Sequence, residues 1–153
     1  MPDHREVRFL PHSREQLFDL VADVGRYAEF LPWVVATRVR SRSEREMVAD
    51  MIVGFKVFRE SFTSRVVLER PGHIHIDYVS GPLKFLYNDW RFEAAEGGAT
   101  VDFHVDFAFR QPMLNRLASN YFDEAFRRMV DAFERRAAEI YAGSSSSSAQ
   151  RTA

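Results

Sequence analysis

The fold is decided by one stretch near the C-terminus, Val101-Asp102-Phe103-His104-Val105-Asp106-Phe107-Ala108-Phe109. Apolar side chains occupy every second position of this stretch, whereas Asp102, His104 and Asp106 share the positions between them. Side chains of a strand alternate between the two faces of a sheet, so the stretch predicts a strand with one dry face and one solvated face. The dry face requires a cover.

A long helix directly after this strand is predicted to be that cover. Pro112 suits the first turn of a helix, and apolar residues recur at helical spacing until Gly143, where we expect the helix to end. A helix of roughly 30 residues, at 1.5 Å per residue, is about 45 Å long, which is enough to cross a whole sheet. The apolar positions are Leu114, Leu117, Tyr121, Phe122, Ala125, Met129, Phe133 and Ile140.

The rest of the sheet is predicted upstream of this strand. Turn signals such as Pro71-Gly72, Gly81-Pro82 and Gly97-Gly98 separate strand-like segments, and no helix-length segment interrupts the series. An antiparallel meander is therefore expected. The predicted strands are residues 35–42, 46–54, 58–68, 73–79, 85–94 and 100–110.

The N-terminal part predicts one more strand and two short helical pieces. Residues 6–10 alternate around Val7 and Phe9, Ser13-Arg14-Glu15-Gln16 is a capping box ahead of a helix, and a second helical piece ends near Pro32. The expected fold class is α+β, with a curved antiparallel sheet of about seven strands around the long C-terminal helix.

Composition limits the classes of function. The 153 residues suit one domain, and 14 Phe is a high number for this length. A net charge of −1 gives no strong field for nucleic acid, and the absence of cysteine excludes disulfides, thiolate zinc sites and cysteine nucleophiles. We expect one domain over residues 1–143 and a disordered Ser-rich tail over 144–153.

No signal peptide or spanning helix is expected. The N-terminus lacks the apolar core of a signal peptide, and no stretch approaches the roughly 18 apolar residues of a transmembrane helix. We expect a cytoplasmic protein.

Several short segments follow one another along the chain and are informative as a set. They are Tyr27-Ala28-Glu29-Phe30-Leu31-Pro32-Trp33, Glu60-Ser61-Phe62-Thr63-Ser64, Gly81-Pro82-Leu83-Lys84-Phe85-Leu86 with Trp90-Arg91-Phe92, and Ala132-Phe133-Glu134-Arg135-Arg136-Ala137. Taken together and in this order, they resemble the coenzyme Q-binding START-like family. This helix-grip family of the polyketide cyclase/dehydrase superfamily also contains the ribosome association toxin RatA. The resemblance covers roughly residues 3–142.

The resemblance implies ubiquinone binding in support of respiratory electron transfer, with no catalytic residues and no catalytic cofactor. Two alternatives remain open. One is a RatA-like protein that blocks ribosomal subunit association through the large subunit, and the other is an enzyme like the polyketide cyclases and aromatases of the superfamily. No DNA partner is expected.

A quinone with an isoprenoid tail requires an apolar tunnel with one or two polar groups. Glu60 and Asn88 share strand parity with apolar residues and are the candidate polar contacts; with Tyr121 they are also the only candidates for catalysis if the protein is an enzyme. The alternative is that the apolar residues simply fill a core. The candidate lining residues are Phe62, Trp90, Phe103, Val105, Phe107, Leu117, Tyr121 and Phe122.

Apolar turns are expected to gather at one end of the sheet. In a meander, alternate turns lie at the same end, so the turns near residues 55–58 and 81–84 should meet the entry to the final helix. Exposed apolar tips beside lysines suit a peripheral membrane contact and a mouth for the ligand, unless the tips fold back over the core. The mouth candidates are Phe55, Lys56, Phe58, Leu83, Lys84 and Phe85.

Two trios of metal-ligand type alternate along strands. They are His73, His75 and Asp77, and Asp102, His104 and Asp106. Both trios lie opposite the apolar faces, so we expect a solvated outer sheet surface and no metal.

Overall fold

The computed structural model describes the backbone of residues 3–55 and 58–152. Within these ranges it describes all side chains except those of residues 55, 58, 118, 122, 123 and 142–152. The elements, in chain order, are β1 (Asp3–Leu10), α1 (Arg14–Ala22), the 3-10 helix η1 (Val24–Glu29), β2 (Val34–Arg42), β3 (Glu46–Phe55), β4 (Phe58–Glu69), β5 (His73–Ser80), β6 (Leu83–Ala95), β7 (Gly98–Phe109) and α2 (Pro112–Thr152).

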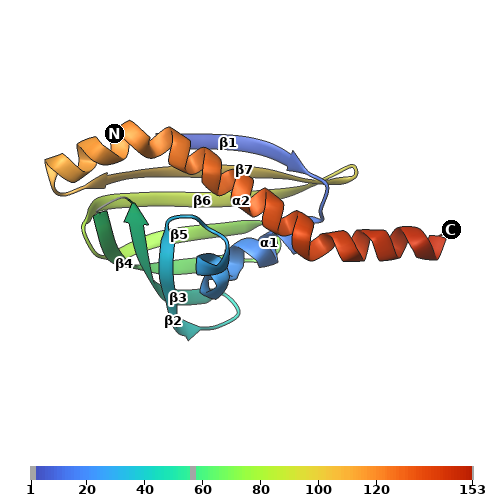
Figure 1. Ribbon diagram of the computed structural model, residues 1–153. Helices are drawn as coiled ribbons and strands as arrows, with labels where there is room; N and C mark the ends of the chain where they lie inside the picture. Colours follow the sequence, from blue (N-terminus) through green and yellow to red (C-terminus); the bar gives the residue numbers. More distant parts are fainter. Residues whose placement is uncertain (1–2, 56–57, 153) are drawn as a thin grey trace.

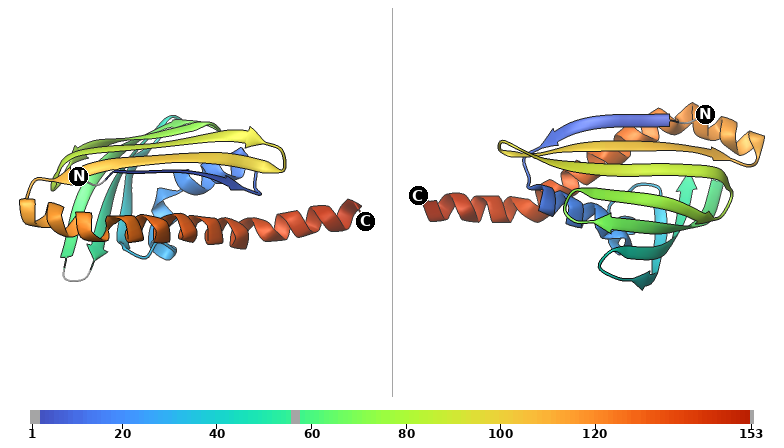
Figure 2. Two further views of the ribbon diagram at one scale, coloured as in Figure 1. Left: turned by 90° about the horizontal axis from the view of Figure 1, so that it is seen from above. Right: turned by 180° about the vertical axis from the view of Figure 1, so that it is seen from behind.

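The strands form one antiparallel sheet in the order β1-β7-β6-β5-β4-β3-β2. Figure 1 shows α2 crossing one face of this curved sheet, with α1 and η1 at the same end as the C-terminal part of the helix. Figure 2 shows from above that the sheet and α2 form two layers. The expected helix-grip architecture is confirmed, and each predicted strand is present to within a few residues.

The first helix begins as its sequence predicts. Ser13 Oγ accepts a hydrogen bond from Gln16 N over 3.1 Å, and Ser13 N donates to Gln16 Oε1 over 3.0 Å. This capping box fixes the start of α1 and directs Leu17, Phe18 and Leu20 into the core.

The final helix continues beyond Gly143, where the sequence predicts its end. It runs to Thr152, because nothing in Ser144 to Ser148 blocks helical backbone hydrogen bonds as proline would. In both figures the last part of α2 projects past the sheet without another element beside it (Figures 1 and 2).

The core lies under the middle part of α2, around residues 129–137. Met129, Ala132, Phe133 and Ala137 are buried there and pack against α1 and the sheet. The Phe133 and Trp90 ring centroids are 5.3 Å apart in an edge-to-face arrangement, which is favourable for aromatic pairs. No helix in the described part of the chain is long and apolar enough to cross a membrane.

Candidate functional site

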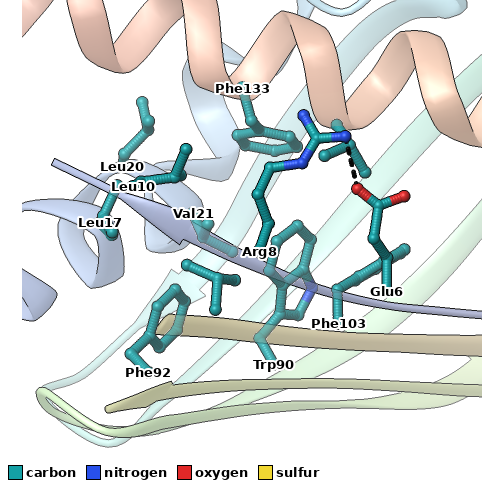
Figure 3. Close-up of a pocket in the computed structure, with 12 residues that line it drawn as sticks. Glu6, Arg8, Leu10, Leu17, Leu20, Val21, Trp90, Phe92, Phe103 and Phe133 are labelled. Atoms are coloured by element: carbon teal, nitrogen blue, oxygen red, sulfur yellow. Dashed lines mark ion pairs between the residues drawn. The ribbon is translucent and has the colours of Figure 1, made fainter. Parts of the chain in front are cut away.

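A pocket lies between the sheet, α1 and α2 (Figure 3). It is a small cavity, with a volume of about 40 Å³. Its walls are apolar except for two charged side chains. The lining residues are Glu6, Arg8, Leu10, Leu17, Leu20, Val21, Trp90, Phe92, Val101, Phe103, Val130 and Phe133.

The two charged side chains of the pocket wall, Glu6 and Arg8, belong to β1. Arg8 Nη2 lies 2.6 Å from Glu6 Oε2, and Arg8 Nη1 lies 2.6 Å from Glu134 Oε2 and 3.3 Å from Asp131 Oδ1 on α2. Figure 3 shows the Arg8 side chain rising from the strand towards the helix, with Glu6 beside it. Burial alone would lower the pKa of Arg8, but its hydrogen bonds to Asp131 and Glu134 and the charge of Glu6 raise it, so Arg8 stays cationic.

Sequence reasoning missed Glu6 and Arg8. Residues 6–10 form a strand as predicted, but Val7 and Phe9 face outward and are 58% and 51% exposed. Glu6 and Arg8 are alternate residues with Leu10 and so project to the same face of the sheet. Because Leu10 is buried, this spacing is the sequence signal that Glu6 and Arg8 face inward.

The concave face of the sheet has two unlike halves. Beneath the middle part of α2, inward residues such as Trp90, Phe92 and Ile74 are buried at 6%, 1% and 1% exposure. Towards the first part of α2, inward residues remain partly exposed, and we call this region the open half. The open half consists of Met51, Phe62, Ile76, Tyr78, Leu86, Asn88 and Phe107.

Strand register places the residues of the open half on one surface. Residues directly opposite each other in an antiparallel pair project to the same face. Met51 is opposite Phe62, Ile76 is opposite Asn88, and Leu86 is opposite Phe107. The ring of Phe126 on α2 lies 5.8 Å from that of Phe103 and 6.5 Å from that of Phe107, at the border between the two halves.

Asn88 is the polar group in the middle of this apolar surface. It lies between Ile76 and Val105 on the neighbouring strands. Its Oδ1 is buried and has no hydrogen-bond partner among the described residues. A buried polar atom without a partner destabilises a fold by about 1–3 kcal/mol, so its presence calls for an explanation.

The predicted lining residues fall into different places. Trp90 and Phe103 line the pocket, while Phe62 and Phe107 belong to the open half. Val105 is 2% exposed, Tyr121 is partly exposed, and Leu117 is 45% exposed on α2. The side chain of Phe122 lies outside the described residues. Glu60 is partly exposed near the start of β4, opposite Val53.

The predicted mouth lies where the β5–β6 turn meets the start of α2. Arg110 N donates to Pro82 O over 3.1 Å, and Figures 1 and 2 place this turn, the facing ends of β3 and β4, and the start of α2 at one end of the molecule. Leu83 is 6% exposed, Phe85 is partly exposed and Lys84 is exposed. Lys56, with the side chains of Phe55 and Phe58, lies outside the described residues.

The predicted polar trios occupy the face of the sheet turned away from α2. The Tyr87 ring lies 5.5 Å from that of His75 and 5.1 Å from that of His104. Asp89 on the same face is 7% exposed. Burial alone would raise the pKa of Asp89, but hydrogen bonds with His73 and His75 more than offset it, so the pKa lies below its ordinary value.

Comparison with known families gives one match over most of the chain. The family described as polyketide cyclase / dehydrase and lipid transport matches residues 10–134.

Two curated relatives are similar over nearly the whole chain. A ribosome association toxin RatA from Rickettsia prowazekii is 33% identical over 144 residues, which cover 92% of this chain and 99% of that protein. A mitochondrial coenzyme Q-binding protein, COQ10 homolog B from Xenopus laevis, is 34% identical over 91% of this chain. The match covers 59% of the Xenopus protein.

Solved structures share the fold. The solution structure of the 18 kDa protein CC1736 from Caulobacter crescentus is 32% identical, with a TM-score of 0.76 over 93% of this chain and 99% of that one. The crystal structure of Zhui aromatase/cyclase from a Streptomyces species has a TM-score of 0.78 over 88% of this chain and 92% of that one, at 14% identity. The second likeness therefore concerns the fold alone.

Proposed function

Because the chain belongs to the polyketide cyclase / dehydrase and lipid transport family, we propose that it binds ubiquinone and carries it for respiratory electron transfer. The observation that supports this most directly is the open half of the concave face. Its large apolar side chains face α2 yet remain partly exposed, which is unfavourable unless another apolar body covers them. A prenyl chain has the required chemistry.

The polar ring of the ligand is proposed to meet Asn88. An amide offers both donors and an acceptor, and the two ends of an Asn amide exchange places by a flip. A quinone carbonyl accepts from the NH2 group, whereas a quinol hydroxyl donates to Oδ1, the atom that has no protein partner among the described residues. The same side chain therefore suits both redox states of the ring.

We propose a carrier rather than an enzyme because the charged side chains at the pocket wall are already paired. Glu6 and Arg8 at the pocket wall pair with each other, and Arg8 also pairs with Asp131 and Glu134. An acid or base committed to such a network is a poor proton donor or acceptor for a substrate. The polyketide-cyclase alternative rests on Glu60, and turnover of an aromatic polyketide that is lost in Glu60→Gln would favour it.

Ribosome association is the second candidate function, and the name of the Rickettsia relative favours it. A contact with ribosomal RNA requires arginines that can reach phosphates. On α2, however, Arg128 pairs with Glu124 at 2.8 Å and Arg136 pairs with Glu29 at 2.7 Å. Cosedimentation with large ribosomal subunits, reduced by Arg135→Glu, would favour this candidate over the carrier.

Membrane contact is proposed at the start of α2, near the β5–β6 turn. Met113 is 71% exposed and Leu117 is 45% exposed, and Lys84 and Arg116 are exposed in the same region of the molecule. Apolar side chains that enter a bilayer while cations meet phosphates are typical of peripheral proteins. Ligand would then enter the open half from the inner face of a respiratory membrane.

The decisive experiment is extraction of bound lipid. The protein is purified without detergent from a ubiquinone-producing host and extracted with organic solvent, and the extract is analysed by mass spectrometry beside an unrelated protein. We expect ubiquinone in near-stoichiometric amount. An extract that stays empty, even after incubation with ubiquinone-loaded liposomes, would contradict the carrier function and leave ribosome association as the leading candidate.

A matched pair of variants locates the site. Asn88→Leu removes the amide at nearly constant volume, so we expect it to retain less than about a tenth of the ubiquinone, a loss of about 1.4 kcal/mol in binding. Asn120→Leu makes the same change at an exposed position of α2 and should retain the wild-type amount. Equal ubiquinone in both variants would remove Asn88 from the site.

A further inference from the structure

Three side chains of metal-ligand type converge on the face of the sheet turned away from α2, the face towards the viewer in the right-hand view of Figure 2. His73 and His75 are alternate residues of β5, and Asp89 lies directly opposite His75 on β6. One ligand atom from each of the three lies within 4.8 Å of the other two.

The inner contacts join both imidazoles to one oxygen. Asp89 Oδ1 lies 2.6 Å from His73 Nε2 and 2.9 Å from His75 Nδ1. Ligand atoms at about 2.0–2.2 Å from a tetrahedral zinc ion are about 3.3 Å apart. A shift of under about 1 Å would open these two contacts to that spacing. The two imidazole nitrogens, which lie within 4.8 Å of each other, would close towards the same spacing as an ion replaces the bridging protons.

The outer contacts orient the two imidazoles. His73 Nδ1 lies 3.6 Å from Glu69 Oε1, and His75 Nε2 lies 3.2 Å from Asp77 Oδ1. Each imidazole thus has one nitrogen towards Asp89 and the other towards a second carboxylate. Histidines that bind metals usually donate their second ring N–H to such a carboxylate, which fixes the tautomer and the direction of the ring.

Two arginines complete this outer layer. Arg91 Nε lies 3.1 Å from Asp89 Oδ2, so the second oxygen of Asp89 is held while Oδ1 faces the imidazoles. Arg65 Nη2 lies 3.3 Å from Asp77 Oδ2 and holds the carboxylate behind His75. The Asp89 side chain is 9% exposed, which is rare for a carboxylate on an outer sheet face. Its burial indicates that the surrounding side chains form an ordered cluster around it.

We propose that His73, His75 and Asp89 bind one divalent transition-metal ion of the zinc class. Two imidazoles and one carboxylate match the three protein ligands of open zinc sites. The imidazoles are 22% and 30% exposed, so a fourth position remains accessible to water. From the sequence, His73 and His75 are grouped with Asp77 and a solvated surface without metal is expected. In the structure, Asp89 on the neighbouring strand is the carboxylate between the two histidines, and Asp77 lies behind His75.

The test is a zinc titration of the full chain, prepared without a histidine tag, against a chromophoric chelator. We expect one zinc ion per chain, with affinity at least about tenfold lower in Asp89→Asn and in His75→Gln. His104→Gln is the matched control, since His104 lies on the same face but contacts Asp3 at 2.7 Å, and it should bind zinc as the wild type does.

Two further measurements exclude trivial outcomes. Circular dichroism of each variant verifies the fold, and Asp77→Asn, which leaves all three ligands in place, should weaken zinc binding by about 10–100-fold through the outer contact. Equal zinc affinity in the wild type and Asp89→Asn, or an equal loss in His104→Gln, would overturn the site. Ubiquinone retention is unaffected by this outcome, because the two sites lie on opposite faces of the sheet.

Discussion

At the scale of single residues, Gly81 packs closely against the open half. Its φ is +143°, in the region that favours glycine, and a Cβ built there would lie 2.7 Å from the Cβ of Phe62. The β5–β6 turn therefore sits directly on Phe62, a residue of the proposed binding surface. Any residue larger than glycine at position 81 must displace either the turn or Phe62.

We predict that Gly81→Ala lowers the free energy of unfolding by about 1–3 kcal/mol, because the side chain adds both backbone strain and a clash with β4. The measurement is urea unfolding at constant pH. Gly25→Ala is the control, since its Cβ would meet only Val39 Cγ2 at 3.8 Å, and it should shift stability far less. Equal losses in the two variants would contradict the close approach at Gly81.

A second residue-scale prediction concerns Asp50. A hydrogen bond from Thr63 Oγ1 over 2.6 Å and another from Arg40 Nε over 2.7 Å lower the pKa of this carboxyl below its ordinary value. With a lowered folded-state pKa, the contacts stabilise the fold above the ordinary carboxyl pKa, and this contribution is lost as pH falls through the folded-state pKa.

Thr63→Val should therefore raise the pKa of Asp50 and reduce the pH dependence of stability in that acid range. Carboxyl NMR titration measures the pKa directly. Asp102, whose pKa is lowered mainly by a hydrogen bond from Arg5, serves as the internal control and should titrate unchanged. A pKa of Asp50 that does not move would show that the hydrogen bond from Thr63 does not lower it.

The limits of sequence reasoning are also clearest at this scale. Alternation locates the strands but does not say which of two faces is inside when both carry apolar residues. In β1, the apolar residues Val7 and Phe9 would be expected to face the core, yet they are exposed. Glu6 and Arg8 face inward instead, because Asp131 and Glu134 on α2 pair with Arg8. Arg8 and Asp131 are 123 residues apart in the chain, and a local pattern cannot reveal a partnership over that separation.

At the scale of elements, the strands and the capped start of α1 follow from local signals, because turn residues and alternation act within a few positions. The end of α2 does not. Serine has an intermediate helix propensity, so the segment after Gly143 is decided by weak preferences rather than by a stop signal. Whether the residues after 143 belong to the folded domain therefore depends on whether they pack against it.

We predict that deleting residues 144–153 changes the melting temperature by less than about 2 °C, since the last part of α2 projects past the sheet and stability comes mainly from packing (Figures 1 and 2). Truncation after residue 128, which removes the buried Met129, Ala132 and Phe133, should abolish cooperative unfolding. Calorimetry of the two truncated chains tests this. A large shift on removal of 144–153 would mean that the segment packs against the domain.

At the scale of the whole molecule, the two halves of the concave face give the first and the middle parts of α2 unlike surroundings. The middle part buries Met129, Phe133 and Ala137. Among the described side chains of residues 112–121, none is buried, and the sheet beneath is the open half. Local opening free energies follow the burial of apolar surface, so the two parts of the helix should open independently and with different ease.

Amide hydrogen exchange should therefore be faster in residues 112–121 than in 129–137 of the free protein. Saturation with ubiquinone should slow exchange in the first segment by about tenfold or more, because the ligand would add apolar contacts to the partly exposed open half, and leave the second segment nearly unchanged. Asn88→Leu, with the same ligand concentration, should show a smaller slowing. Uniform slowing along all of α2 would instead indicate that the ligand stabilises the global fold without occupying the open half, and would move the proposed site to the closed end beneath Phe133.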